Sequence, residues 1–209
     1  MEHLLKHFPA LTARQREQFT AALRLYPEWN AKINVISRKD IDNLEVNHIL
    51  HSLSIAKFIN FTPGTRVLDL GTGGGFPAVP LAVMFPETQF LLVDRVAKKL
   101  RVADDIAAQT GLTNVTTFHG DVREVKEKVD FVISRAVMPL PELEPLAKRL
   151  IDRGHALNAI PNGLICLKGG DLDDEIAKYR CRLIIDDLST YFDEPFFATK
   201  RLLYLPINT

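Results

Sequence analysis

Cysteine is scarce in this chain of 209 residues, since only Cys166 and Cys181 are present. Apolar or basic residues flank both, and the two are not spaced as a CxxC pair. This usage argues against a disulfide framework and against a cysteine-based metal site. We therefore predict two buried thiols in a cytoplasmic protein.

Long hydrophobic runs are also missing, although 46% of the residues are hydrophobic. No apolar run approaches the roughly 20 residues that a membrane-spanning helix needs. The first residues, Met1–Pro9, lack the apolar segment and the small-residue cleavage site of a secretory signal. We therefore expect a globular, cytoplasmic protein with no membrane partner.

Neither sign of charge is in excess, because 26 lysines and arginines balance 26 acidic residues. Balanced charge argues against a protein that coats nucleic acid by bulk positive charge, but it leaves room for a local basic patch. The chain length suits one domain of ordinary size with a small appended element.

The first part of the chain has a helical pattern. Apolar residues from about residue 11 to residue 59 recur at helical spacing, among them Phe19, Leu23, Tyr26, Trp29, Ile33 and Ile36. We predict two or three helices, broken near Pro27 and around residues 37–40, where Asp40 is placed to cap the next helix. The turn at residues 62–65 marks the boundary, so we expect an N-terminal helical element over residues 1–61 and a second domain over 62–209.

After this boundary, short apolar strands alternate with helix-like segments. The expected strands are residues 66–70, 89–93, 115–119, 130–134 and 163–168. The expected helices between and after them are residues 78–85, 96–111, 140–153 and 171–179, with a short turn near 122–128. This alternation predicts an α/β protein with a mostly parallel sheet covered on both faces. Residues 182–188 and 200–206 have no helix between them, so we expect them to form a C-terminal antiparallel hairpin.

Glycine is concentrated in one stretch, Asp69–Pro77, directly after the first expected strand. Glycine suits a backbone that turns sharply or lets a ligand approach closely. In a doubly wound sheet, ligands bind at the carboxyl ends of the strands. We therefore predict a ligand site here with Gly73 among its contacts. The dinucleotide pattern fits only loosely, as GxGxxA from Gly73 to Ala78, so an NAD-dependent oxidoreductase remains an alternative.

Acidic residues stand at the ends of the first three expected strands. Asp69 precedes the glycines, Asp94 ends the second strand and Asp121 follows the third. The carboxylate of Asp94 can accept hydrogen bonds from two ribose hydroxyls, and Asp121 is placed to reach an adenine amino group. A dinucleotide enzyme has less use for Asp69, Asp121 and the final hairpin. The whole set resembles the Rossmann-like class I S-adenosylmethionine-dependent methyltransferases.

Several stretches are similar to the 16S rRNA guanine-N7 methyltransferase family, also called glucose-inhibited division protein B. They follow the family order from about Tyr26 to Lys200, and include Trp29–Asn34, Asn47–Leu53, Asp69–Pro77, Ser134–Ala136 and Leu167–Gly169. The Phe-Pro after the glycines and the Ser-Arg-Ala of the fourth strand are more specific than the glycines themselves. The chain departs from the family pattern at Asn47, His51, Ala78, Arg95 and Asp121.

The resemblance implies an enzyme that transfers a methyl group from S-adenosyl-L-methionine to N7 of a guanosine in bacterial 16S ribosomal RNA. The partner is then 16S rRNA or the small ribosomal subunit. It also implies cofactor contacts at Gly71, Phe76, Val122, Arg123 and Arg135, beside Gly73, Asp94 and Asp121 from the strand pattern. A non-catalytic RNA-binding ribosome-assembly factor is the alternative from another class.

No catalytic acid or base is expected, because N7 of neutral guanine carries a free lone pair and no proton. No metal is expected either, since His48 and His51 share a helix face without further evident ligands. Lys168 allows two interpretations, a phosphate contact at the rim of the site or a surface salt bridge. A local patch for RNA is expected to draw on Arg38, Lys39, Lys98 and Arg135.

Overall fold

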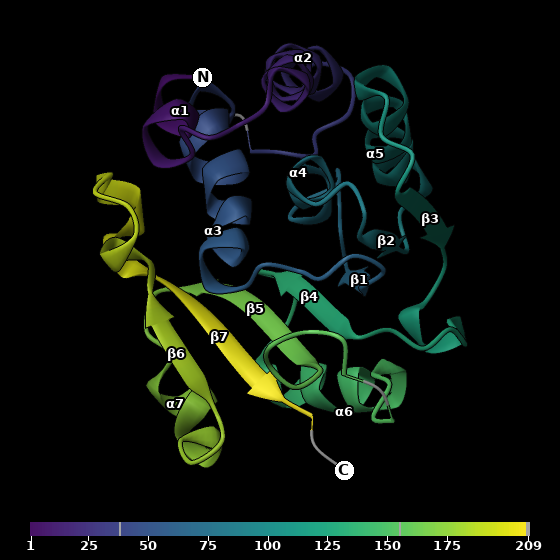
Figure 1. Ribbon diagram of the computed structural model, residues 1–209, viewed down its shortest axis with the longest axis vertical. Helices are drawn as coiled ribbons and strands as arrows, with labels where there is room; N and C mark the ends of the chain where they lie inside the picture. The colour runs from purple at the N-terminus through teal and green to yellow at the C-terminus, as the bar shows by residue number, and fades with distance from the viewer. Residues whose placement is uncertain (38, 155, 208–209) are drawn as a thin grey trace.

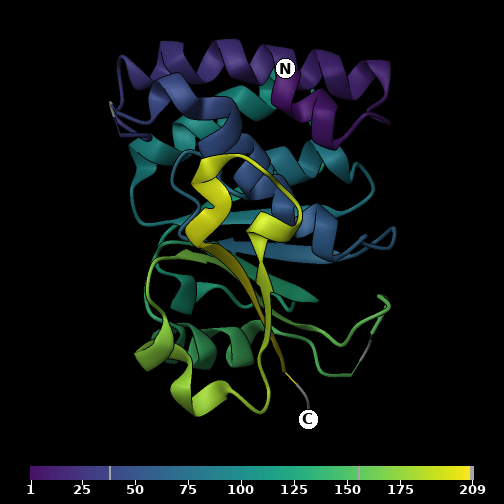
Figure 2. The ribbon, with the colours of Figure 1, turned by 90° about the vertical axis from the view of Figure 1, so that its left-hand side faces the viewer.

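The computed structural model describes residues 1–37, 39–154 and 156–207. It has three layers, with helices on both faces of one central sheet (Figures 1 and 2). The seven strands lie in the order β3-β2-β1-β4-β5-β7-β6. They are β1 Arg66–Leu70, β2 Gln89–Asp94, β3 Val115–His119, β4 Phe131–Arg135, β5 Gly163–Gly169, β6 Ile184–Asp187 and β7 Lys200–Pro206.

Strands β1 to β5 pair in parallel, and β7 pairs antiparallel with both β5 and β6. From β1 the chain first adds β2 and β3 on one side of the sheet and then crosses to add β4 and β5 on the other. This switch in strand order opens a crevice at the carboxyl ends of β1, β2 and β4. This confirms the predicted α/β class, including the antiparallel hairpin at the end of the sheet.

The helices are α1 Glu2–His7, α2 Ala13–Asn30, α3 His51–Phe58, α4 Ala78–Met84, α5 Ala97–Thr110, α6 Leu140–Leu150 and α7 Asp173–Ile176. A π-helix, η2 Glu45–Leu50, leads into α3, and a 3-10 turn, η3 Val122–Glu124, follows β3. Figure 1 shows α1 to α5 on one face of the sheet and α6 and α7 on the other.

Alternation along the strands divides the buried apolar side chains between the two faces. Val67, Phe90 and Phe131 belong to the core under the N-terminal helices, whereas Leu68 and Val132 face α6. This follows from the two-residue period of a strand. The helices of residues 1–61 share the first core with the sheet, and their division from residues 62–209 as a separate domain stays a prediction.

Two details of the predicted helical part are wrong. Helix α2 is not broken near Pro27 but continues to Asn30. Pro27 lies in the last turn, where only one backbone hydrogen bond is lost, and the buried Phe19, Leu25 and Tyr26 hold that face of the helix in the core. Asp40 makes no side-chain cap for the next helical turn.

The thiol prediction is wrong for one cysteine. Cys166 lies buried in β5, on the face covered by α6, but Cys181 is exposed after α7. Cys181 stands between Arg180 and Arg182, which are both exposed, so the segment that carries it lies at the surface. None of the helices in the described parts of the chain combines the length and apolar character that crossing a membrane requires.

Candidate functional site

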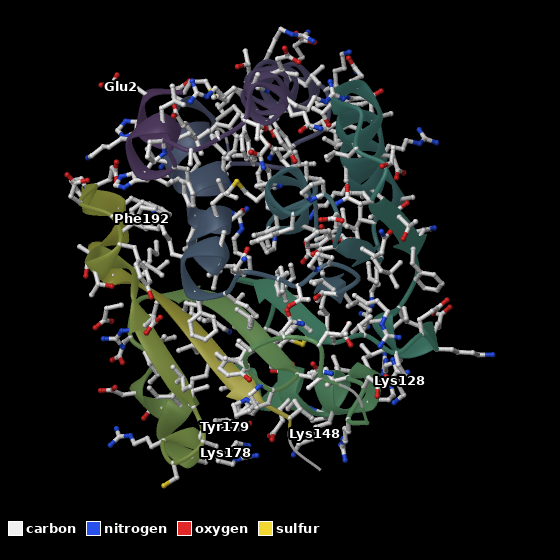
Figure 3. All side chains as sticks on the ribbon, viewed as in Figure 1. Glu2, Lys128, Lys148, Lys178, Tyr179 and Phe192 are labelled. Atoms are coloured by element: carbon white, nitrogen blue, oxygen red, sulfur yellow. The ribbon has the colours of Figure 1, made fainter. Side chains whose placement is uncertain are left out.

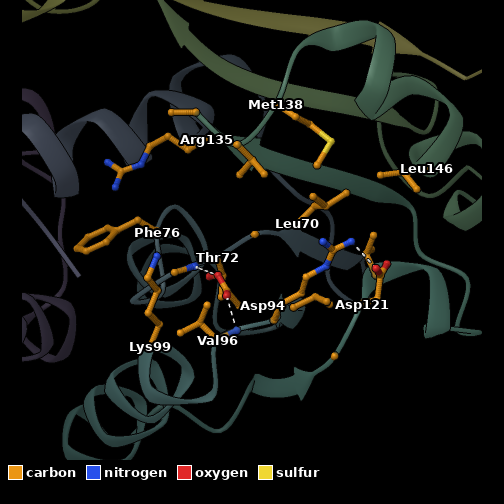
Figure 4. A pocket seen from close by; sticks show the side chains of 18 of the residues that line it. Leu70, Thr72, Phe76, Asp94, Val96, Lys99, Asp121, Arg135, Met138 and Leu146 are labelled. Carbon is orange, nitrogen blue, oxygen red and sulfur yellow. Dashed lines mark hydrogen bonds and ion pairs between the residues drawn. The ribbon is translucent and has the colours of Figure 1, made fainter. Parts of the chain in front are cut away.

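A cavity of about 820 Å³ opens at the carboxyl ends of β1, β2 and β4 (Figure 4). The loop after β1, the start of η3, the end of β4 and one side of α6 form its walls. The residues predicted to contact the cofactor all line it: Gly71, Gly73, Phe76, Asp94, Asp121, Val122, Arg123 and Arg135. Their roles as ligand contacts stay predictions.

The glycine loop needs glycine for two different reasons. Gly73 has a φ of +58°, and a Cβ there would meet no atom within 4 Å, because it would point into open space. Gly75 has a φ of +102°, and its Cβ would lie 2.5 Å from Cγ2 of Val79. Gly73 thus leaves room beside the cavity, while Gly75 permits close packing behind it.

Asp69 lies beneath the loop and does not line the cavity. One carboxylate oxygen accepts hydrogen bonds from the Thr72 hydroxyl at 2.7 Å and from the Ala78 N–H at 3.1 Å. The other oxygen, Oδ1, is buried without a hydrogen-bond partner among the described residues. Burial raises the pKa of Asp69 to about 7. Its role in this structure is therefore to join the two ends of the loop.

Asp94 connects the end of β2 to the same loop. Its carboxylate accepts hydrogen bonds from the N–H groups of Gly73 and Val96, each at 2.8 Å (Figure 4). A carboxylate has about four acceptor positions, so two remain for a ligand. The predicted contact with ribose hydroxyls is compatible with this geometry.

Asp121 is more heavily engaged than the sequence suggests. It accepts hydrogen bonds from the Arg123 backbone at 2.9 Å and from the Arg123 guanidinium at 2.7 and 3.0 Å, and it also pairs with Arg95. The hydrogen bonds from Arg123 lower the pKa of this carboxyl. An adenine amino group would compete with these donors. The N–H of Val122, in the first position of a 3-10 turn, has no acceptor within that turn and is an alternative contact.

Arg135 occupies the opposite end of the cavity, where an aromatic pair supports it. Its guanidinium lies 4.9 Å from the centre of the Phe76 ring, and Phe76 stacks on Tyr26 at 4.5 Å. The Tyr26 hydroxyl donates to the Gly74 carbonyl at 3.0 Å, which ties α2 to the glycine loop. Arg135 also donates to His48 Nδ1 at 3.0 Å. Tyr26 and His48 support this end of the cavity from behind and are not among the predicted site residues, although His48 falls within Asn47–Leu53, one of the stretches similar to the family.

Lys168 forms a salt bridge, as one of its two interpretations expected, but the pair is largely buried and not at the surface. Its ammonium group pairs with Glu175 at 2.9 Å and donates to the Met138 carbonyl at 2.6 Å, and its side chain is only 9% exposed. Lys168 therefore has a structural role. Lys39 and Lys98 do not line the cavity, whereas Arg95, Lys99 and Arg123 do. Arg38 lies outside the described residues.

One group of side chains in the described ranges has the spacing of metal ligands, namely His7, Asp193 and Glu194. It lies away from the cavity, and the carboxylates there pair with Lys6 and with the histidines. His48 and His51, which the sequence places on one helix face, contact different residues. His48 contacts Arg135, and the ring of His51 packs against Phe196 and Phe197.

Solved structures with a similar fold include several methyltransferases. Magnesium protoporphyrin IX methyltransferase from Synechocystis PCC 6803, with bound SAM, matches with a TM-score of 0.58 and 19% identity, over 82% of this chain and 85% of that one. A SAM-dependent methyltransferase from Aquifex aeolicus matches with a TM-score of 0.51 and 16% identity, over 74% and 88% of the chains. At such identities the likeness establishes the class I methyltransferase fold.

Curated relatives are much more similar in sequence. Ribosomal RNA small subunit methyltransferase G from Bacteroides thetaiotaomicron is 56% identical, over 99% of this chain and 100% of the relative. The protein of that name from Porphyromonas gingivalis is 54% identical, over 99% and 93% of the two chains. The model of the family described as rRNA small subunit methyltransferase G matches residues 15–202. This chain therefore belongs to the rRNA small subunit methyltransferase G family.

Proposed function

We propose that the protein transfers a methyl group from S-adenosyl-L-methionine to N7 of a guanosine in 16S ribosomal RNA. The observation that supports this most strongly is the cavity, which all of the predicted contact residues line. Asp94 retains acceptor positions for ribose, Val122 offers a backbone donor for adenine, and the open space at Gly73 suits the methionine portion. With ribosomal RNA as its substrate, the protein is proposed to act in the cytoplasm.

The end of the cavity at Phe76 and Arg135 is the proposed position of the guanine. Phe76 presents an aromatic ring, and Arg135 presents a cation beside it. On its major-groove edge, guanine carries two hydrogen-bond acceptors, O6 and N7. A hydrogen bond from Arg135 to O6 would leave the N7 lone pair free to attack the methyl carbon. No proton has to leave N7, so alignment of nucleophile, methyl carbon and sulfur is the main requirement.

Cationic side chains line the cavity at both of its ends (Figure 4). Arg95, Lys99 and Arg123 line the cavity in addition to Arg135, although the whole chain has a net charge of zero. Cationic side chains at the rim of a site neutralise phosphates and add to affinity for RNA. Asp121 holds Arg95 and Arg123 together at one edge. These residues make up the local patch that we propose for the ribosomal substrate.

The experiment that tests the function has two parts. Calorimetry first compares S-adenosylmethionine with NAD, using the wild-type protein and Gly73→Val, in which a β-branched side chain would enter the cavity at a left-handed φ. Radioactive methyl transfer is then measured on small ribosomal subunits and on naked 16S rRNA, and the modified nucleoside is identified by mass spectrometry.

We expect S-adenosylmethionine to bind the wild-type protein and not Gly73→Val, and N7-methylguanosine to appear in the RNA. Binding of NAD in place of S-adenosylmethionine would favour the oxidoreductase. Cofactor binding without methyl transfer to either RNA substrate would favour the non-catalytic assembly factor. A methyl group on another atom would keep the enzyme class and overturn the N7 assignment.

A further inference from the structure

His48 is joined to the cavity through Arg135. Its Nδ1 accepts a hydrogen bond from Arg135 Nη2 at 3.0 Å, and Arg135 Nη1 donates to the Asn47 carbonyl at 3.4 Å. Both partners belong to the π-helix η2, which lies beside the end of β4. Short π-helical segments occur frequently at functional sites. The guanidinium is therefore held along one edge by two neighbouring residues of η2.

The direction of this hydrogen bond fixes the proton on the histidine ring. Arginine can only donate, so Nδ1 of His48 must be the unprotonated nitrogen, and Nε2 carries the hydrogen. Burial, and then the charge of Arg135, lower the pKa of His48 to about 3. The ring faces the Phe76 ring at 5.4 Å, Arg135 and the nearby Asp40. His48 is thus a neutral acceptor throughout the physiological pH range.

The contacts of Arg135 leave part of its donor set for a ligand. A guanidinium has five N–H donors in a fixed plane. Two of them are directed at His48 and Asn47, while the Phe76 ring supports the guanidinium from one side. The remaining donors belong to a side chain that lines the cavity. Removing the His48 acceptor would free the guanidinium to turn about its last side-chain bonds, so its orientation would no longer be set in advance.

We propose that His48 is a positioning residue for methyl transfer, which holds the Arg135 guanidinium in the orientation that the substrate base requires. The proposal rests on the proposed function, because it assigns His48 to the same site. His48 does not contact the reacting atoms. It acts through Arg135, and it does so as a hydrogen-bond acceptor at the position of Nδ1.

The test uses two substitutions that differ in where they place an acceptor. In His48→Asn the side-chain oxygen occupies about the position of Nδ1, whereas in His48→Gln it occupies about the position of Nε2. Both remove the ring, so both lose the same packing against Phe76. Single-turnover methyl transfer to small ribosomal subunits and calorimetric binding of S-adenosylmethionine are measured for each, together with thermal unfolding.

We expect His48→Gln to lower the single-turnover rate at least about tenfold, the scale of a hydrogen bond to a charged group, and His48→Asn to retain most of the rate. Both variants should unfold at similar temperatures. In a background of Arg135→Ala, the His48→Gln substitution should cause no further loss, since residues that act through one another are not additive.

Equal losses in the Asn and Gln variants, or full additivity with Arg135→Ala, would overturn the positioning role. A wild-type rate in His48→Gln would do the same. These outcomes differ from failure of the proposed function, in which the wild-type protein itself transfers no methyl group to the RNA.

Discussion

Among single residues, Asp69 combines complete burial, a pKa raised to about 7 by that burial, and a carboxylate oxygen with no hydrogen-bond partner in the described parts of the chain. The unfolded chain releases this proton near pH 3.9. Between these values the folded protein binds more protons than the unfolded chain, so the free energy of unfolding falls as the pH rises. The neutral carboxyl is therefore the form that the folded loop favours.

We predict that Asp69→Asn removes this slope. At about 1.4 kcal/mol for each pKa unit, the stability of the wild-type protein relative to the variant should fall by about 4 kcal/mol between about pH 3 and 8. The amide keeps one oxygen as acceptor for Thr72 and Ala78. Urea unfolding at several pH values measures the difference, and a difference independent of pH would contradict it.

A second prediction at this scale concerns the pH dependence of the reaction. Arg135 keeps its charge at neutral pH because burial lowers its pKa only to about 10, and His48 stays neutral. With saturating cofactor, the single-turnover rate should be nearly constant from about pH 7.5 to 9, since N7 has no proton to remove. A bell-shaped profile that one substitution abolishes would show that a general base is needed.

At the scale of elements, the loop between β1 and α4 offers a matched pair of substitutions. Gly73→Ala should cost about 1–2 kcal/mol, the strain of a left-handed backbone alone, because its Cβ meets nothing. Gly75→Ala should lower the free energy of unfolding clearly more. It has the same backbone strain, and its Cβ would in addition clash with Val79, which is buried in α4. Chemical denaturation compares the two, and equal costs would show that the loop shifts freely.

The sequence was sufficient for the strands and for the edge of the sheet at which the cavity lies. Period-two alternation sets the faces of β1 and β4, and parallel pairing then brings Gly73, Asp94 and Arg135 together. Local spacing carries this information, which is why these expectations agree with the structure.

The contacts that could not be predicted from the sequence are those between segments far apart along the chain. The contact of Arg135 with His48 joins residues 87 positions apart, and Tyr26 reaches the glycine loop from 48 positions away. The pairing of Asp121 with Arg95 similarly requires the ends of β2 and β3 to lie side by side. The short helix α1 carries too few apolar positions for a periodic signal.

At the scale of the whole molecule, the first helix is fastened to the segment between β6 and β7. Glu194 contacts His3 at 2.8 Å and His7 at 2.9 Å, and the His7 ring lies 4.9 Å from Phe192, labelled in Figure 3. Burial acts to raise the pKa of Glu194, but hydrogen bonds from His3 and His7 lower it overall. These contacts join α1 to residues 192–194, and both segments contribute to the apolar core that also contains α3.

We predict that Glu194→Ala lowers the free energy of unfolding by roughly 1.5–3 kcal/mol at neutral pH. Asp193→Ala is the control, because its side chain is 71% exposed and its solvated pair with Lys6 should contribute little to stability. Since the folded pKa of Glu194 is lowered, its contribution is present above its unfolded pKa of about 4.3 and is lost as the pH falls below it. Equal effects of the two substitutions at neutral pH would show that the fastening is unimportant.

Because Cys166 is buried in the sheet and Cys181 is exposed, chemical modification of the two thiols can measure how often the sheet opens around β5. Burial raises the pKa of the Cys166 thiol to about 12, while Cys181 is exposed. Because thiolates are the form that alkylating reagents attack, one modified sulfur per chain is expected for the native protein and two after unfolding. Mass spectrometry after a short pulse of iodoacetamide counts them. Rapid modification of both sulfurs under native conditions would mean that β5 separates from its neighbours far more often than its central place in the sheet implies.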